Sequence, residues 1–271
     1  MKNTFKPKVA LITGGGSGIG AAMARELASR GTFVVVADIN FANASAISSE
    51  IGERAEAAEI DVSDQNAVKS LIAGIKNRLG SLDCLVNCAG ITSYGEALHS
   101  SLDEWEKILS VNLMGTIIPS MAAYEIMAKQ RSGTIINMGS MATFLVDPLF
   151  APYITSKFGV VGFSRTLATE AKAYGVHVCV VCPGNIQSAL AAQRYAPSRF
   201  TPIMQPLDAV QKILKAVSQK RRIIVFPTHA RIFWWLDRLD PNFLNPLRQE
   251  IFRRAQRRNA FHNQLESQSE T

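Results

Sequence analysis

A tyrosine and a lysine four residues apart offer the clearest chemistry in this sequence. In Tyr153-Ile-Thr-Ser-Lys157 the phenol and the ammonium would share one face of a helix. A free phenol is a poor base at neutral pH, but a positive charge beside it favours the ionised form. The pair therefore suits acid–base work on an alcohol or a ketone. Taken alone, the same motif could also be an incidental surface pair.

Two polar residues upstream could complete such a site. Ser140 follows the apolar run Thr134 to Met138, which predicts a strand ending at the carboxyl edge of a sheet. There its hydroxyl could hold a substrate oxygen. Asn112 stands in an otherwise apolar helical segment. A buried asparagine needs hydrogen bonds, so a structural role is the alternative to a catalytic one.

A glycine-rich turn, Thr13-Gly-Gly-Gly-Ser-Gly-Ile-Gly20, lies between an expected strand (9–13) and an expected helix (19–29). Its glycines Gly14, Gly18 and Gly20 permit a tight turn and close approach of the backbone to a ligand. The helix N-terminus then offers N–H groups to a pyrophosphate. A glycine-rich turn alone indicates nucleotide binding only weakly, but this one occupies the strand-to-helix position that the mechanism requires.

The choice of dinucleotide depends on Asp38, which ends the second expected strand (33–37), 18 residues after Gly20. A carboxylate there can accept both ribose hydroxyls of NAD and would repel a 2′-phosphate. Positions 15–17 and 39–40 carry no Arg or Lys that could hold such a phosphate. We therefore expect NAD rather than NADP, with a helix-capping aspartate as the alternative.

Strand and helix patterns alternate over more than 200 residues. This alternation predicts an α/β fold, a doubly wound parallel sheet with helices on both faces and ligands beyond the carboxyl ends of the strands. We expect one domain over residues 1–227 and a helical extension over 228–271. Further expected elements are a strand end at Ile60, strands at 82–87, 134–138, 176–182 and 222–227, one or two helices in 102–130, and a helix at 153–174.

Together these motifs resemble the short-chain dehydrogenase/reductase family over roughly residues 6–227. The resemblance implies a Rossmann-like fold. It is carried by Gly14, Gly18, Gly20, Asp61-Val62, Asn87-Cys-Ala-Gly90, Asn112, Ser140, Tyr153, Lys157 and Pro183-Gly-Asn-Ile186.

The resemblance also implies roles for these residues. Tyr153 would exchange a proton with the substrate oxygen, which Ser140 would orient. Lys157 would hold the nicotinamide ribose, and its positive charge would favour the ionised form of the Tyr153 phenol. Asn112 would support Lys157 through a bound water and complete a proton relay. The implied cofactor contacts are Gly14, Ser17, Gly18, Ile19, Gly20, Asp38, Asp61, Val62, Asn87, Ala89, Gly90, Tyr153, Lys157, Pro183, Gly184, Ile186 (at the carboxamide) and Ser188.

The sequence departs from the family pattern at three places. Cys88 replaces the second Asn of the Asn-Asn-Ala-Gly element, and Ser188 stands where a Thr is usual. The family's common C-terminal ending, a strand followed by Asp-Gly-Gly, is absent. Because the family tetramer uses that ending, we expect a homodimer through the two long helical segments (102–130 and 153–174) instead.

Charge is unevenly distributed along the chain. The net charge is +7, yet residues 1–211 hold 17 basic and 17 acidic side chains, whereas residues 212–258 hold 12 basic and 3 acidic. Nucleic-acid binding is not expected, because no recognition fold is visible.

The basic region also carries apolar stripes with helical spacing. The first consists of Ile232, Trp235, Leu236 and Leu239, and the second begins with Leu244, Leu247 and Ile251, edged by arginines. Peripheral membrane contact through residues 229–258 is one interpretation. Docking of the stripes on the domain or on a second subunit is the other.

The cysteines favour a reducing compartment. Cys179-x-x-Cys182 lies in an expected strand, where residues three apart point to opposite faces, so we expect buried thiols and no metal site. The N-terminus shows no signal-peptide core, and no apolar run approaches the ~20 residues that span a bilayer. We expect a cytoplasmic protein, with peripheral membrane contact as a possible addition.

The sequence thus predicts an NAD-dependent oxidoreductase acting on a hydrophobic secondary alcohol or ketone (steroid-like, aromatic or long-chain). The expected pocket residues are apolar: Phe144, Leu145, Leu149, Phe150, Leu190, Tyr195 and Phe200, with the segment 188–206 as a lid. One alternative is a ketoreductase for acyl-carrier or CoA thioesters, whose acidic carrier the arginines would hold. Another is a dinucleotide sensor without turnover.

Overall fold

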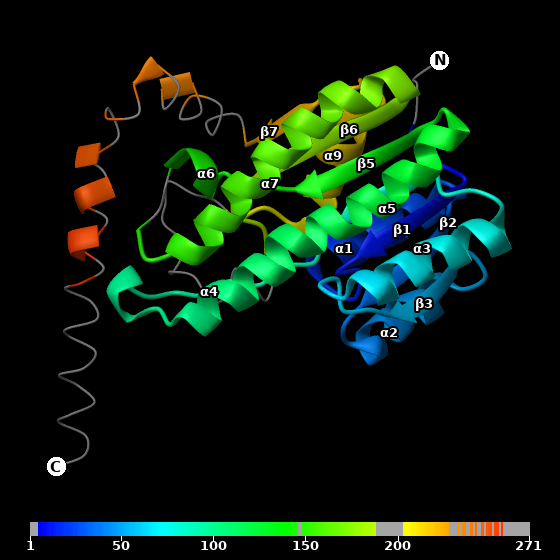
Figure 1. Cartoon of the computed structure of the whole chain (residues 1–271), viewed down its shortest axis with the longest axis horizontal. Coiled ribbons are helices and arrows are strands. Elements are labelled where there is room, and N and C mark those ends of the chain that lie inside the picture. Colours follow the sequence, from blue (N-terminus) through cyan, green and yellow to red (C-terminus); the bar gives the residue numbers. More distant parts are fainter. Residues whose placement is uncertain are drawn as a thin grey trace, which may run out of the picture.

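The computed structural model describes residues 5–145, 148–187 and 203–227, with positions 232, 235–236, 239–240, 242, 245–246, 248–250, 252–254 and 256 of the C-terminal segment. Within these residues, seven strands pair in parallel in the order β3-β2-β1-β4-β5-β6-β7 (Figure 1). The predicted doubly wound α/β fold of a single domain is confirmed.

The strands of the sheet follow the apolar runs of the sequence. They are β1 (Val9–Thr13), β2 (Phe33–Asp38), β3 (Ala55–Glu59), β4 (Cys84–Asn87), β5 (Gly133–Met138), β6 (Val176–Pro183) and β7 (Ile223–Phe226). The helices are α1 (Gly18–Ser29), α2 (Phe41–Ile51), α3 (Gln65–Leu79), α4 (Leu102–Leu109), α5 (Gly115–Gln130), α6 (Ala142–Leu145), α7 (Ala151–Glu170) and α9 (Pro206–Ser218). Short turns η1 (Ala97–His99), η2 (Ser110–Met114) and η3 (Ala171–Tyr174) complete these elements.

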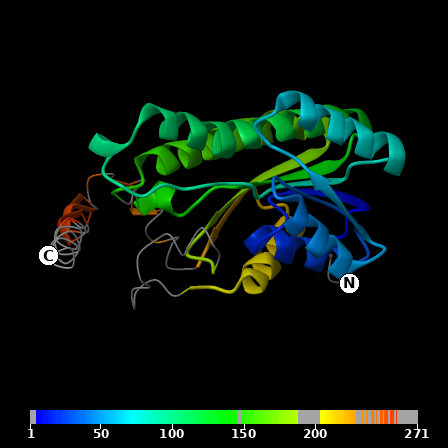
Figure 2. The same ribbon diagram turned by 90° about the horizontal axis from the view of Figure 1, so that it is seen from below.

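The helices form a layer on each face of the sheet (Figure 2). On one face, α1, α2 and α9 pack against alternate strand residues such as Ile12 and Val36. On the other, α3, α5 and α7 pack against Leu11 and Val35. Because successive strand side chains point to opposite faces, each central strand contributes to both layers of the core.

The predicted strand and helix ends agree with the structure to within one residue except in two elements, and hydrogen bonding explains the first. The strand expected from Leu82 begins only at Cys84. The backbone N–H and C=O of Leu82 instead pair with the Gln130 side chain, at 3.2 and 3.0 Å. The helix expected at 153–174 is α7 from Ala151 to Glu170, followed by the 3₁₀ turn η3.

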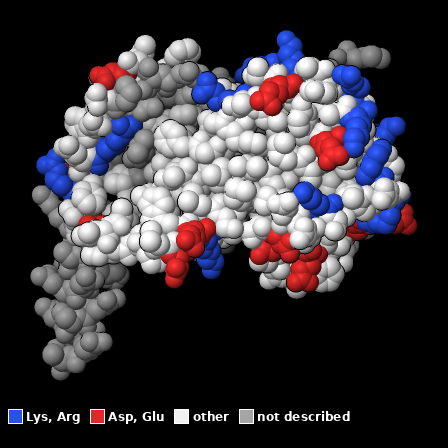
Figure 3. Space-filling view, in the orientation of Figure 1, with Lys and Arg blue, Asp and Glu red and all other residues white. Residues whose placement is uncertain are grey.

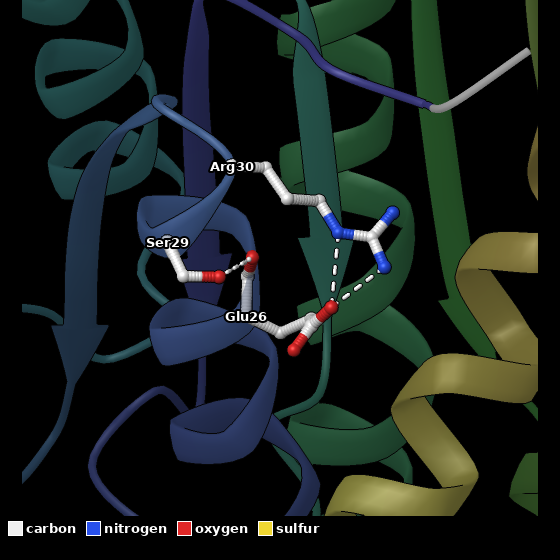
Figure 4. A network of polar contacts seen from close by, with 3 residues as sticks. All are labelled: Glu26, Ser29 and Arg30. Atoms are coloured by element: carbon white, nitrogen blue, oxygen red, sulfur yellow. Dashed lines mark hydrogen bonds and ion pairs between the residues drawn. The ribbon is translucent and has the colours of Figure 1, made fainter.

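Side-chain hydrogen bonds stabilise the last turn of α1 at its C-terminal end. Arg30 donates to the Glu26 carboxylate from both Nε and Nη2, at 3.0 and 2.6 Å, and the Ser29 hydroxyl donates to the Glu26 carbonyl (Figure 4). A carboxylate one turn before an arginine suits the helix, because the positive charge lies at its C-terminal end. This cluster secures α1 at the end remote from the glycine-rich turn.

All four cysteines are free; Cys84, Cys179 and Cys182 are buried as predicted, whereas Cys88 is partly exposed. Cys179 packs in the core layer of α1 and α9, whereas Cys182 packs on the opposite face of β6. Burial raises the pKa of both thiols to about 12, so they stay protonated and unreactive at neutral pH. In the described part of the chain, no three or more His, Cys, Asp or Glu side chains are grouped to hold a metal ion.

The C-terminal segment lies beyond the carboxyl ends of the strands, at the end of the molecule where α4 and α6 are found (Figure 1). Its described helical positions include Ile232, Trp235, Leu236 and Leu239. The second predicted stripe (Leu244, Leu247 and Ile251) lies outside the described residues, and the domain boundary at 227/228 stays a prediction. Among the described residues, none of the helices combines the length and hydropathy needed to cross a bilayer.

His177 makes stability depend on pH. Its Nε2 is buried without a hydrogen-bond partner in the described structure, and burial together with the charge of Lys220 lowers its pKa to about 4. An unfolded histidine, with a pKa near 6.5, takes up its proton earlier. Between these two values the unfolded chain binds more protons, so the free energy of unfolding must fall as pH drops from about 6.5 towards 4.

We therefore expect His177→Leu to reduce the loss of stability between pH 7 and pH 4.5, measured by denaturant unfolding at both values. The exposed His99→Leu is the matched control and should leave that pH dependence unchanged. An equal loss of stability in His177→Leu and in the unmodified protein would contradict this assignment.

Candidate active site

The glycine-rich turn is fastened to the neighbouring strands by its own backbone. Gly15 N–H donates to the Ala37 carbonyl at 3.0 Å. Gly14 has a φ of +63°, and a Cβ there would lie 2.6 Å from the Ala89 backbone nitrogen. A Cβ at Gly20 would overlap the Gly14 carbonyl oxygen. The turn must be glycine at these positions because strand, turn and helix meet at backbone distance.

The start of α1 completes an anion cradle. The helix begins at Gly18, and the side chain of its N-cap Ser17 makes no capping hydrogen bond. No acidic residue occupies the first turn. N–H groups and the positive end of the helix dipole therefore face the turn, which fits the pyrophosphate of a dinucleotide.

Asp38 faces this turn from the end of β2. One carboxylate oxygen accepts from Gly16 N–H at 2.9 Å, and the other accepts from Asn40 N–H at 3.0 Å. A Cβ at Gly16 would lie 2.9 Å from the same carboxylate, so the two elements are in direct contact. The N-cap of α2 is Asn40, whose side chain accepts from Asn43 N–H. Asp38 is therefore not the cap of α2, the alternative role that the sequence analysis considered.

The Asp61-Val62 pair lies on the loop after β3. The Asp61 carboxylate accepts from the N–H and the hydroxyl of Ser63, at 2.8 and 2.6 Å. The Val62 side chain is buried and close to Gly115, where a Cβ would collide with it. These contacts shape the loop on which the sequence predicted adenine binding.

Tyr153 and Lys157 lie one turn apart on α7 and are both 5% exposed. The Lys157 ammonium lies 5.7 Å from the centre of the Tyr153 ring. It donates a 3.0 Å hydrogen bond to the Met138 carbonyl at the end of β5. The strand end thus anchors a buried positive charge beside the phenol, which an incidental surface pair would not show.

Ser140 follows the same strand end. It is 5% exposed, and its Oγ accepts from Ala142 N–H at 3.1 Å. Its carbonyl accepts from the Thr143 hydroxyl at 2.7 Å, which holds the start of α6. The hydroxyl proton of Ser140 is not used in these contacts. The loop after β5 therefore brings Ser140 and the anchor of Lys157 to one edge of the sheet.

Asn112 lies in η2, a π-helical turn between α4 and α5. Its side chain is fully buried. Oδ1 accepts from Ile91 N–H at 2.8 Å, and Nδ2 donates to the Ile91 carbonyl at 2.9 Å and to Ser156 Oγ at 3.0 Å. Asn112 thus ties the loop after β4 to α7. Turns of this type often mark functional sites.

Gly90 keeps the space between these groups open. A Cβ there would lie 3.3 Å from Asn112 Oδ1 and 3.7 Å from Lys157 Nζ. The Asn112 amide and the Lys157 ammonium therefore both face the Gly90 backbone. A ligand approaching along the loop after β4 would meet both groups.

Below these residues lies a buried polar network that sequence reasoning missed. Asn137 on β5 accepts from Asn87 Nδ2 at 2.8 Å and donates to Ser164 Oγ at 2.9 Å. Asn87 Nδ2 also donates to Ser120 Oγ at 2.9 Å. Asn87, predicted to contact the cofactor, therefore turns its side-chain amide into the domain. The signal for Asn137 was a polar residue inside an apolar strand.

The loop after β6 closes the other side of the site. The Pro183 carbonyl accepts from Met141 N–H, next to Ser140, and Gly184 N–H donates to the Phe226 carbonyl. A pocket of about 170 Å³ is lined by Gly184, Asn185, Ile186, Ile203, Met204 and Pro227. Ser188, Leu190, Tyr195 and Phe200 lie outside the described residues, as does the predicted lid apart from 203–206.

The side of the site on which the sequence predicted the substrate pocket is apolar where it is described. Phe144, Leu149 and Phe150 are buried, and Tyr94 packs on Phe150 with ring centres 5.2 Å apart. Leu149 adopts a left-handed conformation with φ 73°, and its carbonyl accepts from Gly95 N–H. The Leu145 side chain lies outside the described residues. Tyr94 was not predicted, because the loop after β4 has no regular pattern.

Comparison with known proteins agrees with this arrangement. The sequence profile described as short chain dehydrogenase matches residues 8–198. The chain belongs to the short-chain dehydrogenase family. It is therefore an oxidoreductase of a family that binds a nicotinamide dinucleotide.

Several relatives of this short-chain dehydrogenase have named activities. A 3-oxoacyl-[acyl-carrier-protein] reductase from Haemophilus influenzae is 40% identical over 179 residues, covering 66% of this chain and 74% of the relative. A 2-(S)-hydroxypropyl-CoM dehydrogenase from Xanthobacter autotrophicus is 34% identical over 208 residues, covering 76% and 82%. The crystal structure of gox2181 superposes with a TM-score of 0.77 at 28% identity, covering 83% of this chain and 95% of that one.

The polar network beneath the site should control the stability of the enzyme. We expect Asn137→Ala to lower the free energy of unfolding by about 1–3 kcal/mol, because a buried group loses its partner. Denaturant unfolding at neutral pH measures the loss. Ser120→Ala is the control and should be milder, since it leaves the bond between Asn87 and Asn137 in place. A larger loss in Ser120→Ala than in Asn137→Ala would refute this ranking.

Proposed function

We propose that this short-chain dehydrogenase transfers a hydride between NAD(H) and a hydrophobic secondary alcohol or ketone. The observation that carries the proposal is the buried Tyr153–Lys157 pair, anchored at the end of β5 beside Ser140. The glycine-rich cradle opens at the same edge of the sheet. Steroid-like, aromatic and long-chain compounds are the substrate class that we infer.

The preference for NAD rests on Asp38. Its carboxylate lies against the glycine-rich turn through Gly16 N–H, where it can accept the ribose hydroxyls of the adenosine half. Positions 15–17 and 39–40 offer no cation for a 2′-phosphate. A negative charge held at this place favours NAD and disfavours NADP.

The remaining residues divide the chemistry among them. When bound, the nicotinamide supplies the hydride acceptor or donor. The Tyr153 hydroxyl gives a proton to the substrate oxygen or removes one, and the Ser140 hydroxyl orients that oxygen. The Lys157 ammonium, held by the Met138 carbonyl, stabilises negative charge on the phenol oxygen. Asn112 positions the loop after β4 and α7 around this centre, and a proton relay through it remains part of the proposal.

The apolar side chains around the site support the substrate class. Phe144, Leu149 and Phe150 are buried beside α6 and the start of α7, and Tyr94 closes against Phe150. An apolar lining favours the transfer of a hydrophobic ligand out of water.

A second candidate function is reduction of a ketone on an acyl-carrier or CoA thioester. It is favoured by relatives named as 3-oxoacyl-[acyl-carrier-protein] reductases and 2-(S)-hydroxypropyl-CoM dehydrogenase. Within the structure it is favoured by Arg248, which donates from Nη2 to the Phe144 carbonyl at 3.2 Å. A cationic side chain at that place could meet an acidic carrier.

We also propose that the protein is a homodimer and that it is located in the cytoplasm. The outer face of α5 and α7 is largely uncharged (Figure 3), and Met114, Met121 and Phe158 on or beside these helices are 44–46% exposed. An apolar face of this kind favours a homodimer. The four free thiols, three of them buried, favour the reducing cytoplasm.

The function is tested by Tyr153→Phe. Removing the hydroxyl should lower kcat by about 10²–10⁴-fold, because proton transfer to the substrate oxygen is lost. The measurement is the change in nicotinamide absorbance with the full-length protein across a panel of apolar secondary alcohols and ketones. Cofactor affinity should change little.

The same panel separates the alternatives. Turnover only with carrier-linked ketones, with a KM that rises steeply with salt, would favour the thioester reductase. Equal activity of Tyr153→Phe and the unmodified enzyme would refute the proposed role of the phenol. Binding of NAD(H) without turnover of any substrate would support a dinucleotide sensor.

The cofactor preference is tested by Asp38→Asn. Loss of the charge should lower the preference for NAD over NADP by about tenfold to a hundredfold, as expected for a hydrogen bond to a charged group. The ratio of kcat/KM for the two cofactors measures it. Asp61→Asn is the matched control, because its carboxylate lies on the loop after β3 and is bonded to Ser63 rather than to the glycine-rich turn. An unchanged ratio in Asp38→Asn would contradict the assignment.

A further inference from the structure

The C-terminal segment crosses the rim of the candidate active site. Arg248 donates from Nη2 to the carbonyl of Phe144 in α6, four residues beyond Ser140. Gln256 donates to the Glu96 carboxylate at 3.2 Å, on the loop that follows β4. Figures 1 and 2 show this segment beyond the carboxyl ends of the strands. These contacts connect α6, which follows Ser140, to the loop after β4.

The segment presents apolar side chains to solvent. Ile232, Trp235 and Leu239 have the spacing of one helix face and are 60%, 59% and 79% exposed, with Leu236 partly covered. Docking of this stripe on the chain's own domain would have buried it. Exposed apolar side chains gathered on one helix face mark a surface for interaction.

The charge of the segment indicates what that surface is. Residues 228–258 contain seven arginines against two aspartates and one glutamate. Arg253 and Arg254 both lie near Glu250, yet their side chains remain 59% and 75% exposed. The described basic side chains of this segment lie at the left of Figure 3. Exposed Trp and aliphatic residues beside an arginine surplus suit the boundary of an anionic bilayer.

The rim carries a second apolar patch. Leu98 in η1 is 85% exposed and Leu102 at the start of α4 is 78% exposed. Both follow Glu96, the residue that Gln256 contacts. Apolar residues therefore stand on the rim itself as well as on the C-terminal segment.

We infer that the described residues of the C-terminal segment, namely Ile232, Trp235, Leu239, Arg253 and Arg254, dock the protein on an anionic phospholipid bilayer, with the rim of the active site facing the lipid. A second copy of the chain is a less suitable occupant, because a cationic segment would meet its own charge across a two-fold axis. The uncharged face of α5 and α7 offers that copy a separate site. The inference concerns binding alone and holds whichever substrate is turned over.

The first test uses the full-length protein and flotation with vesicles of phosphatidylcholine, with and without phosphatidylglycerol. We expect partition onto the anionic vesicles, weakened by salt. Ile232→Ser combined with Leu239→Ser should lower the partition coefficient at least about tenfold, because two exposed apolar side chains no longer enter the interface. Tyr174→Ser is the matched control, a 45% exposed aromatic after α7 at the opposite edge of the sheet.

Further variants separate the parts of the inference. Arg253→Gln and Arg254→Gln should each weaken binding to anionic vesicles by about fivefold and reduce its salt dependence. Leu98→Ser should weaken binding as well, because the rim faces the bilayer. An unchanged Leu98→Ser would overturn that orientation.

Three outcomes overturn the docking inference as a whole. They are absence of flotation with anionic vesicles, equal partition of the double variant and the unmodified protein, and loss of the dimer in the double variant by light scattering without lipid binding. The last would assign the stripe to a second copy. Turnover of a water-soluble substrate by the double variant is measured alongside, so failure of lipid docking remains distinct from failure of the proposed reaction.

Discussion

The hydrogen bond between the side chains of Asn87 and Asn137 holds together the elements that carry the site. These residues are register partners at the carboxyl ends of β4 and β5, and the two amides meet at 2.8 Å inside the protein. Ser120 from α5 and Ser164 from α7 complete the network. Every member of the network is buried, so moving a strand or helix would leave a polar group without a hydrogen bond. The free-energy cost of such an unpaired group favours one relative position of β4, β5, α5 and α7. Residues on the adjoining loops and helices acquire their positions from it.

The site itself is a consequence of parallel pairing. All strands end at the same edge of the sheet, so the glycine-rich turn after β1, Asp38 after β2 and Ser140 after β5 face one region although the sequence separates them. The Gly16 backbone touches the Asp38 carboxylate, which couples the phosphate cradle to the place where the ribose would lie. The groups proposed to bind the cofactor and those proposed to act in catalysis thus share a rigid frame.

The other faces of the molecule remain available for association. The proposed dimer uses the outer side of α5 and α7, whereas the proposed lipid contact uses the edge where the strands end. These surfaces differ in character, since the first is largely uncharged and the second combines exposed aliphatic residues with arginines. The second arrangement is compatible with the proposed reaction, because the hydrophobic alcohols proposed as substrates would concentrate in lipid.

The sequence by itself determined the α/β alternation, most strand boundaries to within one residue, and the family, because apolar runs, glycine turns and the Tyr153–Lys157 spacing are local signals. It placed β1 from Val9 to Thr13 as the structure has it. Only the tertiary structure decided the π turn at Asn112, the inward direction of Asn87 and the role of Asn137. Their partners lie 21 to 50 residues away along the chain. The role of a buried side-chain amide depends on the group that forms its hydrogen bonds, and only the folded structure brings that group close enough.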